Sequence, residues 1–237
     1  MGVPFDHAVS YRPGTRFGPA ALRESLKNYS LYNSVYGDEL EALKIVDSGD
    51  VGVSNDIAET HRRVERVLGA LLRNGISPVV IGGDHSLSYP GVKSLAGAFG
   101  RVGLVVFDAH YDARDPVPGK EHSGLWVKQA LGLGPAALQG RNVVQVGIGA
   151  FCYSSSHRRA AEEQGVRVVS CAEVYERGID PVMEEALALA ADGTGAVYVS
   201  VDIDVVDQAF APGTSVPNPF GLNPYQVLRG VYVAGRH

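Results

Sequence analysis

The chain has 237 residues, of which 45% are hydrophobic, and its formal net charge is −5. This length and composition suit a globular protein with a sizeable core, and the acidic balance argues against a nucleic-acid or anionic-membrane partner. Two cysteines are too few for a disulfide framework, no apolar run reaches the ~20 residues that span a bilayer, and no signal-peptide pattern is present; we therefore expect a cytoplasmic protein with reduced thiols.

Helical patterns and short apolar runs alternate along the chain. Amphipathic spacing predicts helices over 18–29 and 55–75, the second beginning at Asn/Asp caps and ending at a glycine. From residue 77 onward, β-branched runs predict strands, and helical spacing fills the intervals between them. The predicted strands are 77–83, 101–108, 142–149, 166–171 and 195–202, and the helices that accompany them are 91–99, 124–132, 155–164, 180–191 and 223–233.

The predicted strands are uniformly apolar, which is typical of a parallel sheet covered by helices on both faces. Repeated strand–helix units with right-handed crossovers indicate an α/β protein with three layers, α/β/α, and a mainly parallel central sheet. We expect a single domain over residues 1–237, and its abrupt ends, "MGVPFD" and "GVYVAGRH", leave two alternatives open at each, the biological end or a truncation.

Imidazole and carboxylate groups follow three of the predicted strands, at the ends where such sheets bind ligands. The motifs are "GGDHS", "FDAHYDARD" and "SVDIDVVD", and the groups they supply are His85, then Asp108, His110 and Asp112, then Asp202 and Asp204. Spacings of two residues would direct the side chains within a motif to one side if each strand continued in extended form. We expect the sheet to bring the three motifs together.

Two imidazoles and four carboxylates in one crevice would repel each other unless cations neutralised them. Oxygen ligands with a minority of imidazole suit Mn²⁺, and bridging carboxylates suit two ions roughly 3.5–4 Å apart that share a hydroxide. Taken alone, His85 is more typical of a turn or cap, and each Asp could cap a helix. Three such motifs at successive strand ends favour a centre of two Mn²⁺ ions.

These motifs resemble, in order and spacing, the signatures of the ureohydrolases, the dimanganese family of arginases, agmatinases and formimidoylglutamases. The opening stretch "GVPFDHAVSYRPGTRFGPAALRES" is similar to that family's N-terminal segment. The resemblance implies the arginase-type fold, a small-molecule amidine or guanidine substrate whose C–N bond is hydrolysed, and a homo-oligomer.

The resemblance also implies a role for each ligand. One Mn²⁺ would be held by His85, Asp108, Asp112 and Asp202, and the other by Asp108, His110, Asp202 and Asp204. Asp108 and Asp202 would therefore bridge the two ions. Asp112 would also be catalytic, because its carboxylate would accept a hydrogen bond from the attacking hydroxide and orient it.

The stretch "EHSGLWVKQ" departs from the His-Gly-Thr-Pro-like stretch of guanidine-cleaving members, in which the His assists proton transfer. Aligned on the imidazole, His122 takes that catalytic position. If the stretches are aligned on Gly124 instead, Ser123 takes that position, which resembles formimidoylglutamases. Ser123 and Gly124 would then contact substrate. Two later stretches, "VVDQAFAPG" and "APGTSVPNP", also differ from the usual sequences of guanidine-cleaving members. We therefore expect hydrolysis of N-formimino-L-glutamate to glutamate and formamide; the alternative is an agmatinase or another guanidine hydrolase that releases urea.

Two further classes stay open. A dimetal phosphoesterase also uses Asp-x-His motifs, but it needs histidines downstream, and His237 is the only histidine after Asp204. A catalytically impaired homologue with an interaction role would lack the family's C-terminal glutamate, which would fall beyond His237. The complete ligand set argues against that second class.

Overall fold

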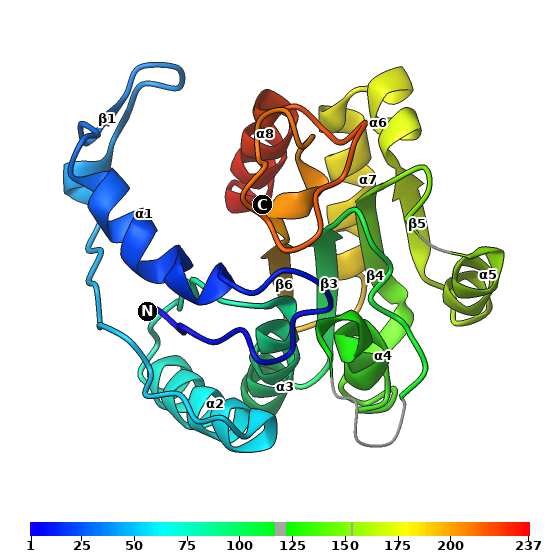
Figure 1. Cartoon of the computed structure of the whole chain (residues 1–237), viewed down its shortest axis with the longest axis horizontal. Coiled ribbons are helices and arrows are strands. Elements are labelled where there is room, and N and C mark those ends of the chain that lie inside the picture. The colour runs from blue at the N-terminus through cyan, green and yellow to red at the C-terminus, as the bar shows by residue number, and fades with distance from the viewer. Residues whose placement is uncertain (117–121, 153) are drawn as a thin grey trace.

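The computed structural model describes residues 1–116, 122–152 and 154–237, and its centre is a four-stranded parallel sheet between helices (Figure 1). The strand order is β5-β4-β3-β6. These strands are β3 (Val102–Phe107), β4 (Leu138–Ile148), β5 (Arg167–Ser170) and β6 (Ala196–Val201). The predicted three-layer α/β/α fold is confirmed.

Eight helices accompany the sheet within the described residues. They are α1 (Gly18–Leu26), α2 (Ile57–Arg73), α3 (Ser88–Phe99), α4 (Trp126–Leu131), α5 (Ser155–Glu163), α6 (Cys171–Arg177), α7 (Ile179–Ala191) and α8 (Pro224–Gly235). A small antiparallel pair, β1 (Tyr32–Asn33) and β2 (Asp38–Glu39), follows α1 and lies apart from the main sheet (Figure 1). None of these helices combines the length and apolar composition needed to cross a bilayer.

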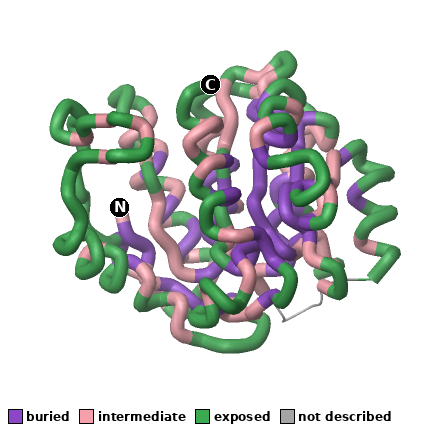
Figure 2. Tube along the Cα trace, turned by 90° about the horizontal axis from the view of Figure 1, so that it is seen from above, coloured by how far each residue is buried: buried purple, intermediate pink, exposed green. Residues whose placement is uncertain are grey.

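The central strand β3 is buried on both of its faces, as its apolar sequence predicts (Figure 2). Val105 and Phe107 belong to a core cluster shared with α7 and α8, whereas Leu104 and Val106 belong to the cluster shared with α3 and α4. Gly103 permits close packing of α7, since a Cβ there would lie 2.0 Å from the Ala190 carbonyl oxygen.

The predicted strand over 77–83 is wrong. Within the described residues this run forms only one isolated bridge, between Ile81 and Gly2, and Val79 is 70% exposed. Strand β6 pairs with β3 on one side, and its other edge has no neighbouring strand in the described chain. A β-branched run becomes a strand only where it has a partner for its backbone groups.

The N-terminal segment is joined to the carboxyl ends of the strands by hydrogen bonds. The Phe5 carbonyl accepts a bond from the Asp84 amide at 2.8 Å, and the Ala8 carbonyl accepts one from the Ser123 amide at 2.7 Å. The Ala8 amide in turn donates to the Asp84 carboxylate at 2.9 Å. These bonds place the first residues of the chain beside two of the predicted site motifs.

Candidate metal centre

Three turns at the carboxyl ends of the sheet carry the predicted ligands. His85 begins a 3₁₀ turn, His85–Leu87, which Asp84 caps by accepting a hydrogen bond from the Ser86 amide at 3.0 Å. Asp108 directly follows β3, and Asp202 directly follows β6. Because β3 and β6 are parallel neighbours, their carboxyl ends lie side by side.

The local geometry differs from the extended backbone that the spacing suggested. Strand β3 ends at Phe107, and Asp112 has a left-handed φ of +46°. Asp202 caps a second 3₁₀ turn, Ile203–Val205, by accepting a bond from the Asp204 amide at 3.0 Å. Tight turns, not extended strand ends, therefore direct these carboxylates inward, and a non-glycine residue at positive φ is typical of such functional turns.

The six predicted ligands form two adjoining groups. Nδ1 of His85 lies 3.0 Å from Asp108 Oδ2, 3.2 Å from Asp112 Oδ2 and 3.1 Å from Asp202 Oδ2. Nδ1 of His110 lies 3.4 Å from Asp108 Oδ1 and 3.0 Å from Asp204 Oδ2. Asp108 thus offers one oxygen to each group, which is the arrangement a bridging carboxylate needs. The imidazole that Asp202 contacts is that of His85, so its carboxylate falls in the His85 group.

Burial and mutual charge shift the pKa values across this cluster. Burial raises the pKa of Asp112 to about 6, and the neighbouring Asp108 carboxylate adds to the effect. Burial also acts on Asp108, but the imidazoles of His110 and His85 beside its oxygens outweigh it and lower its pKa to about 2. Burial and the Asp202 charge raise the pKa of Asp204. The four acids therefore compete for the positive charge near them.

The donor set fits divalent cations. His85 Nδ1 and Asp108 Oδ2 are buried, and neither makes a hydrogen bond of acceptable geometry within the described residues. His85, Asp108 and Asp112 place ligand atoms within 4.8 Å of one another, and so do Asp108, His110 and Asp204. Carboxylate oxygens with one imidazole in each group, and no thiolate, suit Mn²⁺ better than a soft metal.

Ser200 lies behind His85 and was not identified from the sequence. Its Oγ is 2.8 Å from His85 Nε2 and 2.9 Å from Ser88 Oγ. An imidazole whose Nδ1 binds a cation carries its proton on Nε2, and Ser200 can accept that proton in a hydrogen bond. The available signal was its position two residues before Asp202 on the same strand face.

A cavity of about 340 Å³ opens onto the metal-ligand cluster. Its lining includes five of the six ligands, His85, His110, Asp112, Asp202 and Asp204, while Asp108 is buried beneath them. Arg114 and Ser123 line the same cavity. Arg114 also escaped the sequence analysis, although it follows Asp112 by two positions.

His122 and Ser123 face different spaces. His122 lines a separate cavity of about 360 Å³ together with His61 and Tyr89, whereas Ser123 lines the metal-ligand cavity. Burial, followed by the positive charge of Arg114, lowers the pKa of His122. Gly124 is buried and lines neither cavity. The alignment on Gly124 therefore agrees with the geometry, and the catalytic position suggested for His122 has no support from it.

Comparison with known proteins assigns the family. The family model described as the arginase family matches residues 1–235. The chain belongs to the arginase family. It is 35% identical over 239 residues to a formimidoylglutamase of Halalkalibacterium halodurans, with all of this chain and 74% of the relative covered. It is 36% identical over 231 residues to the mitochondrial agmatinase of Gallus gallus, with 96% of this chain and 67% of the relative covered.

Solved structures of arginase-family members share the fold. A formimidoylglutamase from Bacillus subtilis aligns with a TM-score of 0.94 at 29% identity, covering all of this chain and 74% of that one. A formiminoglutamase of Trypanosoma cruzi with Mn²⁺ aligns with a TM-score of 0.91 at 28% identity, covering 99% of this chain and 79% of that one. The predictions of an arginase-type fold and of a hydrolase of this family are confirmed.

Proposed function

We propose that this arginase-family protein is a dimanganese hydrolase that cleaves N-formimino-L-glutamate to glutamate and formamide. The observation that carries the proposal is the convergence of two imidazoles and four carboxylates beneath a cavity that also contains Ser123. Similarity to formimidoylglutamases over the whole chain supports it. We further propose that the protein is cytoplasmic, which its two free cysteines support, and that it is a homo-oligomer, as its family resemblance implies.

The ligand roles follow from the two groups, and the family resemblance adds the bridging role of Asp202. His85, Asp108, Asp112 and Asp202 would hold one Mn²⁺; Asp108, His110 and Asp204, with Asp202, would hold the other. Two bound Mn²⁺ ions supply Lewis acidity and make a water molecule nucleophilic at neutral pH. The protein's part is to hold the ligands deprotonated and in position before substrate arrives.

Asp112 has the position of a proton-transfer group. Its carboxylate lines the cavity beside the other proposed ligands. A carboxylate there can accept a proton from the attacking water and return it to the leaving nitrogen. Attack on the amidine carbon followed by cleavage of the bond to the glutamate nitrogen then gives formamide and a free amino group.

Ser123 supplies a neutral hydroxyl where guanidine-cleaving relatives carry an imidazole. A hydroxyl can donate to or accept from the amidine nitrogens without adding charge to the cavity. Agmatine hydrolysis is the second candidate, because the Gallus gallus agmatinase is 36% identical to this chain.

The test is a substrate panel with Mn²⁺-loaded protein. Formamide released from N-formimino-L-glutamate, at a kcat/KM at least tenfold above urea release from agmatine, is the expected result. Urea release alone would transfer the assignment to a guanidine hydrolase. Two bound manganese ions per chain with no turnover of any amidine or guanidine would indicate the catalytically impaired homologue.

A further inference from the structure

The lining of the metal-ligand cavity contains one permanent positive charge. Among the described residues, Arg114 is the only lysine or arginine in the cavity lining. The acidic groups of that lining are Asp84, Asp112, Asp202 and Asp204, and three of these belong to the metal-ligand cluster. The cavity lining therefore combines acidic metal-ligand groups with one guanidinium.

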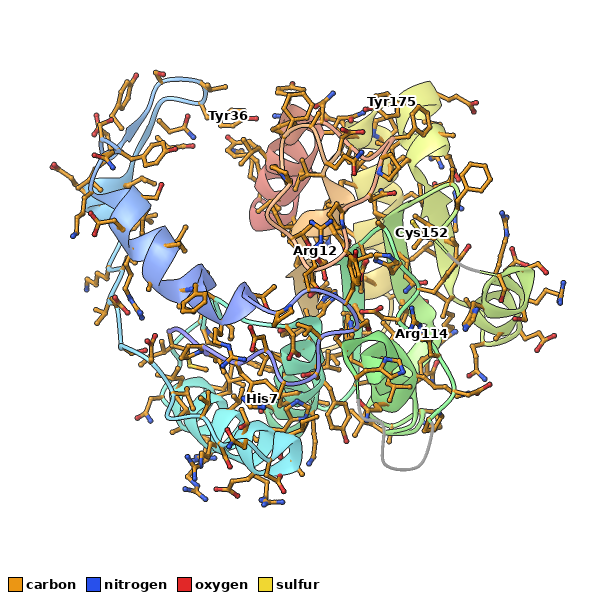
Figure 3. The ribbon with its side chains drawn as sticks, viewed as in Figure 1. His7, Arg12, Tyr36, Arg114, Cys152 and Tyr175 are labelled. Carbon is orange, nitrogen blue, oxygen red and sulfur yellow. The ribbon has the colours of Figure 1, made fainter. Side chains whose placement is uncertain are left out.

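Backbone geometry fixes where the Arg114 side chain leaves the chain. The Arg114 amide donates to the Gly124 carbonyl at 3.0 Å, which joins the second motif to the stretch that contains Ser123. A Cβ on Gly124 would lie 3.3 Å from Arg114 Nε, a distance shorter than ordinary packing. Gly124 thus leaves the space that the half-buried arginine occupies, near helix α4 in Figure 3.

We propose that Arg114 binds the carboxylate at the far end of the substrate and thereby restricts this site to acid-bearing amidines or guanidines. This inference rests on the proposed function, because it assumes that the amidine end lies at the metal-ligand cluster. A guanidinium binds a carboxylate through two parallel charge-assisted hydrogen bonds. It repels the ammonium group that agmatine carries at the corresponding end, so the same residue selects one class and rejects the other.

Relatives of this chain are named for substrates that differ in the charge at the end far from the guanidine. A guanidinobutyrase of Pseudomonas aeruginosa is 35% identical to this chain, and the agmatinase of Gallus gallus is 36% identical. By their names these two relatives act on guanidines with opposite charges at the far end, a carboxylate in one and an amine in the other. The charge at the far end of the substrate must therefore be discriminated within the cavity, and Arg114 lines the cavity of this chain.

The test compares Arg114→Gln and Arg114→Lys with wild type. The matched control is Arg141→Gln, which removes the same charge from an exposed residue that lines no part of the cavity. Steady-state kinetics with N-formimino-L-glutamate, 4-guanidinobutyrate and agmatine give the specificity. Calorimetry measures the binding of N-formyl-L-glutamate without any turnover. This compound keeps both carboxylates of the substrate and has an uncharged formamide in place of the amidine.

Arg114→Gln is expected to weaken N-formyl-L-glutamate binding about 10- to 100-fold, the loss of a charge-assisted pair. It should raise KM for both acids by a similar factor with kcat within about threefold, while agmatine turnover stays level or rises. Arg114→Lys should recover part of the affinity, since it keeps the charge but not the planar fork. Arg141→Gln should behave as wild type.

Binding of N-formyl-L-glutamate to Arg114→Gln within twofold of wild type would overturn the inference, and so would no measurable binding to wild type. Equal losses for acids and agmatine would overturn it as well. The proposed function fails separately: if wild type hydrolyses no amidine but Arg114→Gln still loses affinity, the carboxylate site stands without the reaction. Unfolding temperatures of all four proteins identify any variant that is misfolded, in which case Arg114→Lys decides.

Discussion

Ser200 Oγ lies 2.8 Å from His85 Nε2, on the side of the imidazole opposite the three carboxylates that surround Nδ1. The serine is itself held by Ser88, whose hydroxyl oxygen is 2.9 Å away. This pair fixes the ring's orientation and tautomer from outside the ligand shell, so that Nδ1 is available to a cation.

Ser200→Ala should therefore weaken manganese binding by about 10- to 100-fold, the usual effect of removing a hydrogen-bond partner of a metal-binding histidine. Titration with Mn²⁺ under competition from a chelator measures the affinity. The exposed Ser77→Ala provides the control. Unchanged affinity in Ser200→Ala would show that His85 is held by its carboxylate neighbours alone.

Asp108→Asn tests the shared ligand. Because Asp108 directs one oxygen to each imidazole group, its loss should remove both ions, leaving less than about 0.2 manganese per chain after dialysis. Asp115→Asn is the control from the same motif, since that side chain is 88% exposed and pairs with Lys128. Elemental analysis gives the metal content. Two manganese ions retained in Asp108→Asn would contradict the bridging role.

The sequence predicted those parts of the fold that are buried on both sides. Strand β3 was found because all its residues are apolar and lie between helices. The run 77–83 has the same composition, but its structure depends on a backbone partner that no local pattern specifies. Helix α6 was missed although Ser170 and Glu173 form a start signal, with the Ser170 hydroxyl accepting from the Glu173 amide at 3.2 Å.

The candidate site was predicted by residue type more accurately than by geometry. Asp108 and His85 were identified because imidazole and carboxylate after apolar strands have few structural roles in combination. The left-handed Asp112 was not foreseen, since a two-residue spacing assumes an extended backbone. Arg114 and Ser200 were missed because a single arginine or serine acquires a role only from what the fold places beside it.

Ser123 and His122 can be separated by substitution. Ser123→Ala should lower kcat/KM for the amidine by about tenfold, because it removes a hydroxyl from the metal-ligand cavity. His122→Gln should change kcat/KM less than about threefold, because its ring lines the other cavity. Both variants should bind manganese as wild type does. A larger loss in His122→Gln than in Ser123→Ala would restore the imidazole to the catalytic position.

The buried imidazole of His61 should make the free energy of unfolding depend on pH. His61 is not one of the proposed metal ligands. The residue is buried, its Nε2 lies 3.1 Å from Ser86 Oγ, and burial lowers its pKa to about 4, with smaller opposing effects from Glu65 and Lys93. The unfolded chain takes up a proton on this imidazole below its ordinary pKa of 6.5, whereas the folded protein does so only near 4. Stability is therefore lost as the pH falls from 6.5 towards 4, and above 6.5 the residue contributes no pH dependence.

The expected difference is about 2 kcal/mol at pH 5, from 1.36 kcal/mol per pH unit over the roughly 1.5 units between the ordinary pKa of 6.5 and pH 5. His61→Gln removes the titrating group and keeps a polar side chain near Ser86. Urea unfolding of wild type and variant at pH 7.5 and pH 5 measures the effect as a difference between the two proteins, so that all other titrating groups cancel. Wild type should lose about 2 kcal/mol more than the variant over this range, and parallel losses would show that His61 is already protonated in the folded protein at pH 5.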